Sequence, residues 1–266
     1  MDNVGDSQPK YKYGIIGRIF GIVDRPQTRK VGITETYEYK YTTSRLAYYL
    51  IGMFAIVLAR IFWRFRVEGK ENLPKNLHCV FMPNHVSHLD SFAVAIPLYP
   101  KRPIHFIADE KLFKNPIFRR LAPHVNVFPV RKGAKQVGVV KYSEKIVQRG
   151  GTLLWYPEGQ RHKQPWLNKC NPGKIGSGWL AIETKVPIIP VFLRGPEIAM
   201  PVGKSITWGR RFRSIEILVK YGKPVYLDDL RALPPSKEVA QEAVNRIINA
   251  IEELRTEVDS RATKSN

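Results

Sequence analysis

A histidine and an aspartate lie five residues apart in the segment 83–92, at His85 and Asp90. The apolar run 79–82 and a Pro-Asn pair precede them, which indicates a buried strand that ends in a loop. Ser87 stands where a helix N-cap is expected, with Asp90 three residues later. On one helix, residues five apart point about 140° away from each other. If the helix begins at Ser87, however, His85 lies on the loop and can fold back. Asp90 would then accept a hydrogen bond from one ring nitrogen and leave the other as a general base.

The same residues also fit a purely structural role. Residues 87–90 form a capping box, and the helix dipole favours an aspartate at this place. A histidine before a helix is commonly just a loop residue. The pair alone therefore leaves both catalysis and helix capping open.

Two further motifs follow apolar runs of the same kind. Arg131 ends the run 127–130, and an arginine there can bind a phosphate through two parallel hydrogen bonds. Glu158, Gly159 and Arg161 follow the run 153–157, with glycine permitting a turn. We expect the carboxylate and the guanidinium to project into one cleft, where they would hold hydroxyls and a phosphate. A surface ion pair is the alternative.

A glycine-rich stretch at 172–178 contains Lys174. It lacks the spacing of a nucleotide-binding P-loop. We interpret it as a helix entry that directs Lys174 toward an anion, with a plain turn as the alternative. The apolar run 186–191, which contains two prolines, is expected to form a wall beside the cleft.

The elements that must position these residues alternate along the chain, which predicts an α/β fold with a mainly parallel sheet flanked by helices. We predict strands at 78–82, 103–108, 126–130, 152–156, 187–193 and 215–221, and helices at 88–98, 111–121, 134–149, 174–184 and 236–257. Ligands of such sheets bind beyond the carboxyl ends of the strands, where His85, Arg131 and Glu158 would meet. We expect an N-terminal segment at 1–65, a main domain at 66–260 and a polar tail at 261–266.

The charge of the chain predicts an anionic partner. Its 43 Lys and Arg residues against 23 Asp and Glu give a formal charge of +20. The stretch 101–174 holds sixteen basic and four acidic residues, a net of +12, and so carries over half of the excess. Nucleic acid, a membrane surface and a phosphorylated substrate are the partners that such a surplus favours.

The most apolar segment, 46–59, has 14 residues. A spanning helix needs about 20 apolar residues, and shorter runs are more often interfacial or buried. Arginines and aromatic residues flank the run, which is typical of a helix in an anionic membrane interface. We therefore expect an N-terminal membrane-interface helix, and we keep a buried core helix and a full span as alternatives. The chain has two cysteines, Cys79 and Cys170, so a reducing compartment is expected, and no secretory signal is evident.

Taken together and in this order, the motifs resemble the glycerolipid acyltransferase family, typified by lysophosphatidic acid acyltransferase. The family has an H-x4-D block, matched by His85 and Asp90, and a block ending in arginine, matched by 128–131. Its third block is usually F-P-E-G-T-R-S, which reads Y-P-E-G-Q-R-H at 156–162. Its fourth, V-P-I-x-P-V, is matched by 186–191. The resemblance covers about 67–226. Gln160 and His162 depart from the usual Thr and Ser, which bears on the acceptor more than on the chemistry.

The resemblance implies transfer of a fatty acyl group from acyl-CoA or acyl-carrier protein to a hydroxyl of a glycerol-phosphate lipid, most often lysophosphatidic acid. It implies His85 as general base and Asp90 as its partner. It implies that Arg131, Glu158 and Arg161 hold the glycerol-phosphate end, and we add Gly159 and Lys174 as candidate substrate-binding residues. It implies no metal and no cofactor beyond the donor thioester, and a membrane-associated protein on the cytoplasmic face of the plasma membrane or of an endomembrane. Another lyso-lipid or a glycolipid stays open as the acceptor.

Three other classes of function are alternatives to this interpretation. A metal-dependent hydrolase could use His85, His88 and Asp90, but H-x-x-H-x-D matches no usual metal-ligand spacing. A non-catalytic protein that binds anionic lipid explains the charge and the apolar segment, but not three functional groups at one sheet edge. Nucleic-acid binding fits the charge alone, because no nucleic-acid motif appears.

Overall fold

The computed structural model of the chain describes residues 29–31, 34–36, 45–100, 103–130, 136–162, 164, 169–203, 205–207 and 214–264. The strands are β1 (Arg29–Val31), β2 (Thr34–Thr36), β3 (Arg64–Glu68), β4 (Val80–Pro83), β5 (Ile104–Asp109), β6 (Val127–Val130), β7 (Thr152–Leu154), β8 (Ile188–Arg194) and β9 (Glu216–Tyr221). The α-helices are α2 (Arg45–Phe62), α3 (Asp90–Ala95), α4 (Pro116–Leu121), α5 (Gln136–Gln148), α6 (Ile175–Glu183), α7 (Pro196–Ala199), α8 (Asp228–Arg231) and α9 (Lys237–Lys264). Short 3-10 helices are η1 (Lys70–Asn72), η2 (Ile96–Leu98), η3 (Glu110–Lys114) and η4 (Ala122–Val125).

Seven strands form one sheet in the order β3-β9-β8-β4-β7-β5-β6. Strands β4 to β8 all run parallel, and the one antiparallel pairing among these seven strands joins β8 to β9. The carboxyl ends of β4, β6, β7 and β8 therefore lie at one edge of the sheet. The predicted α/β fold with a mainly parallel sheet is confirmed, and the predicted site residues follow strands that end at this edge.

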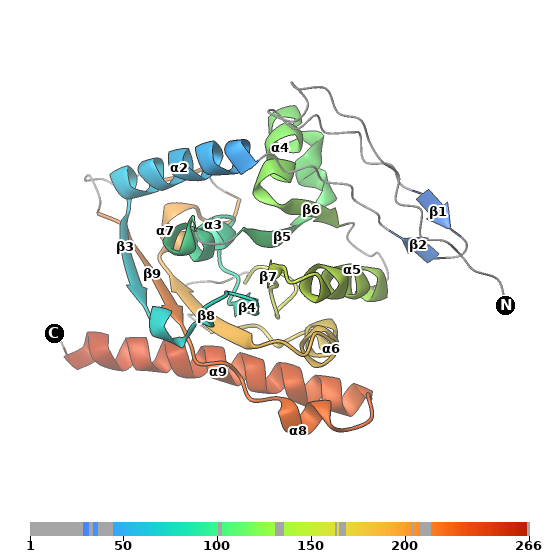
Figure 1. The fold of residues 1–266 in the computed structure, drawn as a ribbon. Helices are drawn as coiled ribbons and strands as arrows, with labels where there is room; N and C mark the ends of the chain where they lie inside the picture. Colours follow the sequence, from blue (N-terminus) through green and yellow to red (C-terminus); the bar gives the residue numbers. More distant parts are fainter. Residues whose placement is uncertain are drawn as a thin grey trace.

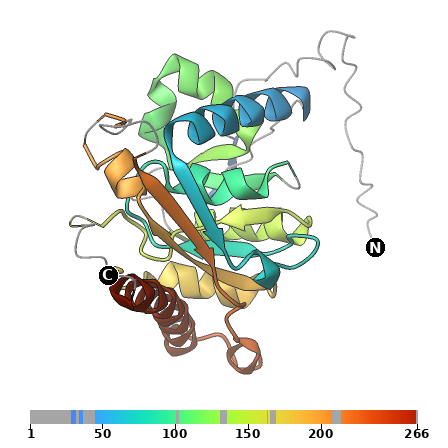
Figure 2. The ribbon, with the colours of Figure 1, turned by 90° about the vertical axis from the view of Figure 1, so that its left-hand side faces the viewer.

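Helices cover both faces of the sheet (Figure 1). On one face, α2, α3 and α7 enclose a core that includes Phe81, Leu154 and Tyr221. On the other, α5, α6 and α9 enclose a second core that includes Met82 and Phe192. Figure 2 shows α2 and α9 on opposite sides of the sheet. Side chains alternate between the two cores along β4 and β8, as a strand buried on both faces requires.

Away from the predicted site residues, two helical predictions differ from the structure. The expected helix 111–121 is broken into η3 and α4, because the Asn115 side chain accepts from the amides of Ile117 and Phe118 and caps a new helix at Pro116. The last helix does not stop at 257. It continues to Lys264, through most of the segment expected to be a tail, with Val258 buried in the second core.

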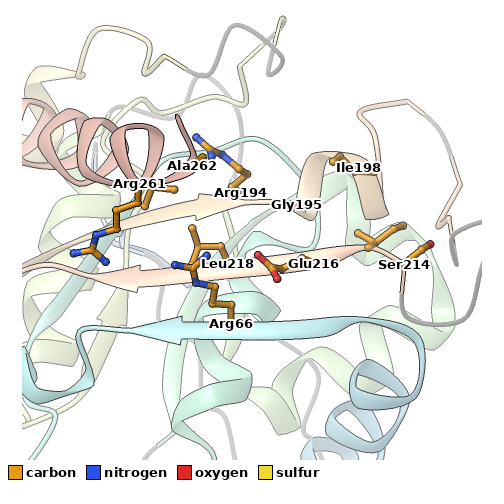
Figure 3. A pocket seen from close by; sticks show the side chains of 11 residues that line it. Arg66, Arg194, Gly195, Ile198, Ser214, Glu216, Leu218, Arg261 and Ala262 are labelled. Atoms are coloured by element: carbon orange, nitrogen blue, oxygen red, sulfur yellow. The ribbon is translucent and has the colours of Figure 1, made fainter. Parts of the chain in front are cut away.

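The end of α9 is tied to the sheet by arginines that line a cavity of about 550 Å³ (Figure 3). Arg66 and Arg261 both pair with Glu68, at 2.7 and 3.2 Å, and Arg194 pairs with Asp259. None of the described site residues lines this cavity. The Arg261 pair fastens α9 to β3 and the Arg194 pair fastens it to β8, whereas Arg66 and Glu68 lie in the same strand.

The helix expected over 46–59 is present as α2. Its inner side reaches the first core through Ala59, and the indole of Trp63 donates to the carbonyl of Thr207 over 3.4 Å. Its outer side exposes a row of large apolar residues at helical spacing, namely Leu46, Tyr49, Leu50, Met53, Phe54, Val57 and Ile61. Within the described part of the chain, no helix combines the length and the hydropathy that a membrane span needs.

Candidate active site

The loop that carries His85 is fixed at the end of β4. The side-chain amide of Asn84 donates to the carbonyl of Leu193 over 3.0 Å, and its oxygen accepts from the amide of Leu193 over 2.7 Å. This double contact joins the ends of β4 and β8. It sets the point where the chain leaves the sheet and places His85 next to it.

His85 and Asp90 are in contact, as their spacing predicts. Nδ1 of His85 lies 2.7 Å from Oδ2 of Asp90, whose side chain is fully buried. The same oxygen accepts from the backbone amides of Val86 and Ser87, at 2.7 and 2.8 Å. A carboxylate oxygen is an acceptor, so Nδ1 carries the hydrogen and Nε2 presents a lone pair. The arrangement gives a base whose tautomer is set by Asp90.

The start of the helix differs from the prediction. Helix α3 begins at Asp90 rather than just after Ser87, and Leu89 is its N-cap without a side-chain bond. The Ser87 hydroxyl donates to the carbonyl of Met200 over 2.8 Å and accepts from the amide of Leu89. Asp90 thus reaches back to the Ser87 amide, but the reciprocal half of a capping box is not formed.

The ring of Tyr156 stacks on the imidazole of His85. The two ring centroids are 3.7 Å apart, with planes inclined by 17°. The tyrosine hydroxyl lies 2.7 Å from Oγ of Ser91, which follows Asp90 in α3. His85 is therefore held at its edge by Asp90 and on one face by Tyr156.

Glu158 does not project into the cleft as we expected. Its side chain is buried, at 1% exposure. Oε1 accepts from the amide of His85 over 2.7 Å, and Oε2 accepts from the amide and the side chain of Asn171, both over 2.7 Å. Burial raises the pKa of Glu158 to about 7 despite these hydrogen bonds. Glu158 therefore links the loop that carries His85 to the loop that carries Asn171.

Gly159 and Arg161 complete this turn. Gly159 has φ +67°, and an added Cβ would lie 2.9 Å from Cγ of Lys174, so the turn favours glycine. Arg161 Nη1 lies 3.1 Å from Nδ1 of His88. Because a guanidinium only donates, His88 accepts there, and burial followed by the charge of Arg161 lowers its pKa. Arg161 therefore lies on the His88 side of the loop that carries His85, with a neutral imidazole as partner.

Of the two other predicted residues, the structure describes Lys174. Lys174 precedes α6, is exposed, and donates its backbone amide to the carbonyl of Pro157 over 2.8 Å. Arg131 lies outside the described residues, one position after the end of β6. The structure thus brings together His85, Asp90, Glu158 and Arg161, and places the side chain of Lys174 beside Gly159.

Sequence reasoning missed Asn171 and the pair formed by Tyr156 and Ser91. Asn171 is thirteen residues from Glu158 and in no motif, so no local signal marks it. Tyr156 stands in the third block, but its stacking depends on a side-chain orientation that spacing does not give. In the described part of the chain no three His, Cys, Asp or Glu side chains group as metal ligands would.

Comparison with known proteins agrees with this architecture. Residues 64–194 match the model of the family described as Acyltransferase, which covers both His85 and Arg161. The segment 64–194 belongs to the acyltransferase family. The resemblance to glycerolipid acyltransferases is thereby confirmed.

Among the proteins similar to this chain is a chloroplastic 1-acyl-sn-glycerol-3-phosphate acyltransferase of Brassica napus, 28% identical over 161 residues. The match covers 59% of this chain and 45% of that protein, so the chain spans less than half of that relative. A 1-acyl-sn-glycerol-3-phosphate acyltransferase of Bacillus subtilis is 25% identical over 189 residues, covering 70% and 87%. The fold is shared with the 1-acyl-sn-glycerophosphate acyltransferase PlsC of Thermotoga maritima, at TM-score 0.57, 24% identity and 80% coverage of each chain.

Proposed function

We propose that this acyltransferase moves a fatty acyl group from acyl-CoA or acyl-carrier protein to the free hydroxyl of lysophosphatidic acid, giving phosphatidic acid. One observation carries the proposal, namely the 2.7 Å contact between Nδ1 of His85 and the buried Asp90. It leaves Nε2 as the basic nitrogen of a side chain that is 15% exposed. The names of the matched relatives support the choice of acceptor.

The proposed reaction is a direct transfer without a covalent enzyme intermediate. Nε2 of His85 takes the proton of the acceptor hydroxyl as its oxygen attacks the thioester carbonyl. The tetrahedral intermediate collapses with cleavage of the carbon–sulfur bond, and the imidazolium returns the proton to the leaving thiolate. Asp90 stabilises the imidazolium while it exists. The step balances with the two substrates and His85 alone.

Arg161 is the residue to which we assign the acceptor phosphate. Its Nη1 bond to His88 fixes the guanidinium beside the His85 loop, and its Nε is buried without a partner among the described residues. A bidentate contact with a phosphate would use such a group. We keep Arg131 and Lys174 as additional phosphate contacts. We reassign Glu158 from holding substrate to holding the backbone of His85, because both of its oxygens are occupied.

Two residues of the third block, Gln160 and His162, bear on the identity of the acceptor. Gln160 is exposed where the family usually has Thr, and His162 donates its amide to the carbonyl of His85 over 2.7 Å. Both residues adjoin Arg161, so they lie where they would contact the head group of the acceptor. Another lyso-lipid or a glycolipid is the alternative acceptor.

We further propose that the protein works on a membrane surface, at its cytoplasmic face. The exposed apolar row of α2 supports this, since a soluble surface rarely presents so many large apolar side chains together. Ile117 and Leu121 of α4 add exposed apolar area, and Arg119 and Arg120 of the same helix add positive charge. An amphipathic helix with basic flanks binds anionic bilayers through burial and charge together.

An assay of purified protein in detergent tests the proposed reaction. Labelled acyl-CoA and acyl-carrier protein are each supplied with lysophosphatidic acid, glycerol 3-phosphate, a lysophospholipid and a glycolipid. We expect labelled phosphatidic acid from lysophosphatidic acid, and none from His85→Ala prepared in parallel. Labelling of another acceptor alone would replace the acceptor assignment. Lipid binding without transfer to any acceptor would support the non-catalytic alternative.

A further inference from the structure

A second side chain besides Asp90 restrains His85. The phenol ring of Tyr156 lies against the imidazole at 3.7 Å, nearly parallel to it. A single hydrogen bond from Nδ1 to Asp90 fixes one edge of the imidazole, but it lets the ring tilt about that contact. A flat ring in van der Waals contact prevents the tilt on its side.

The tyrosine ring is itself anchored to the helix that carries Asp90. Its hydroxyl bonds to Ser91 over 2.7 Å. Burial and then the charge of Asp90 hold the pKa of Tyr156 well above its ordinary value, so the hydroxyl keeps its proton. Both restraints on His85 thus originate from adjacent residues in the first turn of α3.

We propose that Tyr156 is a positioning residue for His85, holding the imidazole plane through its ring and holding its own ring through the hydroxyl bond to Ser91. The proposal rests on the proposed acyl transfer, in which His85 is the base. The resembling family usually has phenylalanine here, which keeps the ring without the hydroxyl. The face of an aromatic ring also attracts a cation, so the contact strengthens when His85 carries the proton. Because that state occurs during reaction, the contact favours the transition state over the bound substrate.

Four variants separate the ring from the hydroxyl. Tyr156→Leu removes the ring, Tyr156→Phe removes the hydroxyl alone, and Ser91→Ala removes the anchor of the hydroxyl. Trp155→Phe is the matched control, because Trp155 packs on the second core and donates to Ser177 over 2.9 Å. It changes an aromatic residue at the next position without touching His85.

The first readout is spectroscopic and independent of turnover. In protein with labelled histidine, the ring protons of His85, assigned by their loss in His85→Ala, should be shifted upfield by the stacked phenol. The shift should persist in Tyr156→Phe and Trp155→Phe and disappear in Tyr156→Leu. If the ring protons of His85 in the wild-type protein have the chemical shifts of an unstacked histidine, the proposal is overturned, whatever the activity.

The second readout is kinetic. We expect Tyr156→Leu to lower kcat on the order of 10-fold, about 1.4 kcal/mol, with little change in either KM. Tyr156→Phe should keep most of the kcat that Tyr156→Leu loses, and Ser91→Ala should have a kcat similar to that of Tyr156→Phe. Trp155→Phe should keep wild-type kcat. Wild-type kcat in Tyr156→Leu, with the upfield shift gone, would overturn the positioning role. An upfield shift in a wild-type protein that transfers no acyl group would count against the proposed function, and the stack itself would stand.

Discussion

The backbone amide of His85 donates to Oε1 of Glu158 over 2.7 Å. This contact joins the first and third sequence blocks, which lie on different loops. The other oxygen of Glu158 holds Asn171 through two more hydrogen bonds. The carboxylate therefore fixes the position of His85, the proposed base, while Arg161 of the same turn is the residue to which we assign the acceptor phosphate.

Glu158→Gln tests the buried position of Glu158 through the pH dependence of the protein's stability. Burial raises the pKa of Glu158 from 4.5 to about 7, so the folded protein holds a proton that the unfolded chain releases. The resulting stabilisation is full below pH 4.5, declines as the pH rises, and is lost above about pH 7. Its size is about 3 kcal/mol at most. The glutamine variant should lack this part of the pH dependence, measured as Tm between pH 5 and 8.

The same variant should lower kcat more than either KM. An amide group would set a donor against the amide of His85 or of Asn171, which loosens the loop. If the variant keeps wild-type kcat and raises only the KM for the acceptor, Glu158 contacts the acceptor, as the sequence had predicted.

Asp90→Asn should lower kcat on the order of 10²–10⁴-fold, since the neutral amide no longer stabilises the imidazolium. We expect only a small change in Tm, because the amide oxygen can still accept from the amides of Val86 and Ser87. Glu197→Gln is the control: Glu197 accepts from the amide of Gly195 over 2.9 Å and bonds to no residue of the His85 loop. If Asp90 is only a cap, both variants should lose about 1 kcal/mol of stability and keep their rate.

Arg161→Ala should raise KM for lysophosphatidic acid by about 10-fold or more, through loss of a charged phosphate contact. The KM for the acyl donor should move less. Arg194→Ala removes another partly exposed arginine, which lines the cavity of Figure 3 and pairs with Asp259, and it should leave both KM values unchanged. An equal rise of both KM values in Arg161→Ala would contradict the assignment.

Phe54→Glu should weaken binding to vesicles that contain anionic lipid, since Phe54 lies in the outer row of α2 at 65% exposure. Tyr226→Glu is matched in exposure, at 67%, and follows β9 at the edge of the sheet opposite the site. Co-sedimentation of the two variants with vesicles measures the difference. Equal binding by both would show that the outer row of α2 does not face the bilayer.

The parts of this site that depend on neighbouring residues in the chain could be predicted from the sequence. The contact between His85 and Asp90 follows from a strand end, a loop and a helix start within ten residues. The inward turn of Glu158 could not be foreseen, because its partner Asn171 comes from a loop that tertiary folding brings back. The prediction of one helix over 111–121 did not include the cap at Asn115, whose side chain accepts from two backbone amides and starts a new helix at Pro116. The place of β9 between β3 and β8 depends on long-range pairing, which spacing along the chain does not encode.

The central claim is that His85 is the base of an acyl transfer, and the most direct test compares wild type with His85→Ala. Both proteins are purified in detergent, and phosphatidic acid formed from acyl-CoA and lysophosphatidic acid is followed by mass spectrometry. We predict that the variant keeps its Tm within about 2 °C. We predict that its rate falls on the order of 10²–10⁴-fold. Turnover by His85→Ala near that of wild type would contradict the account.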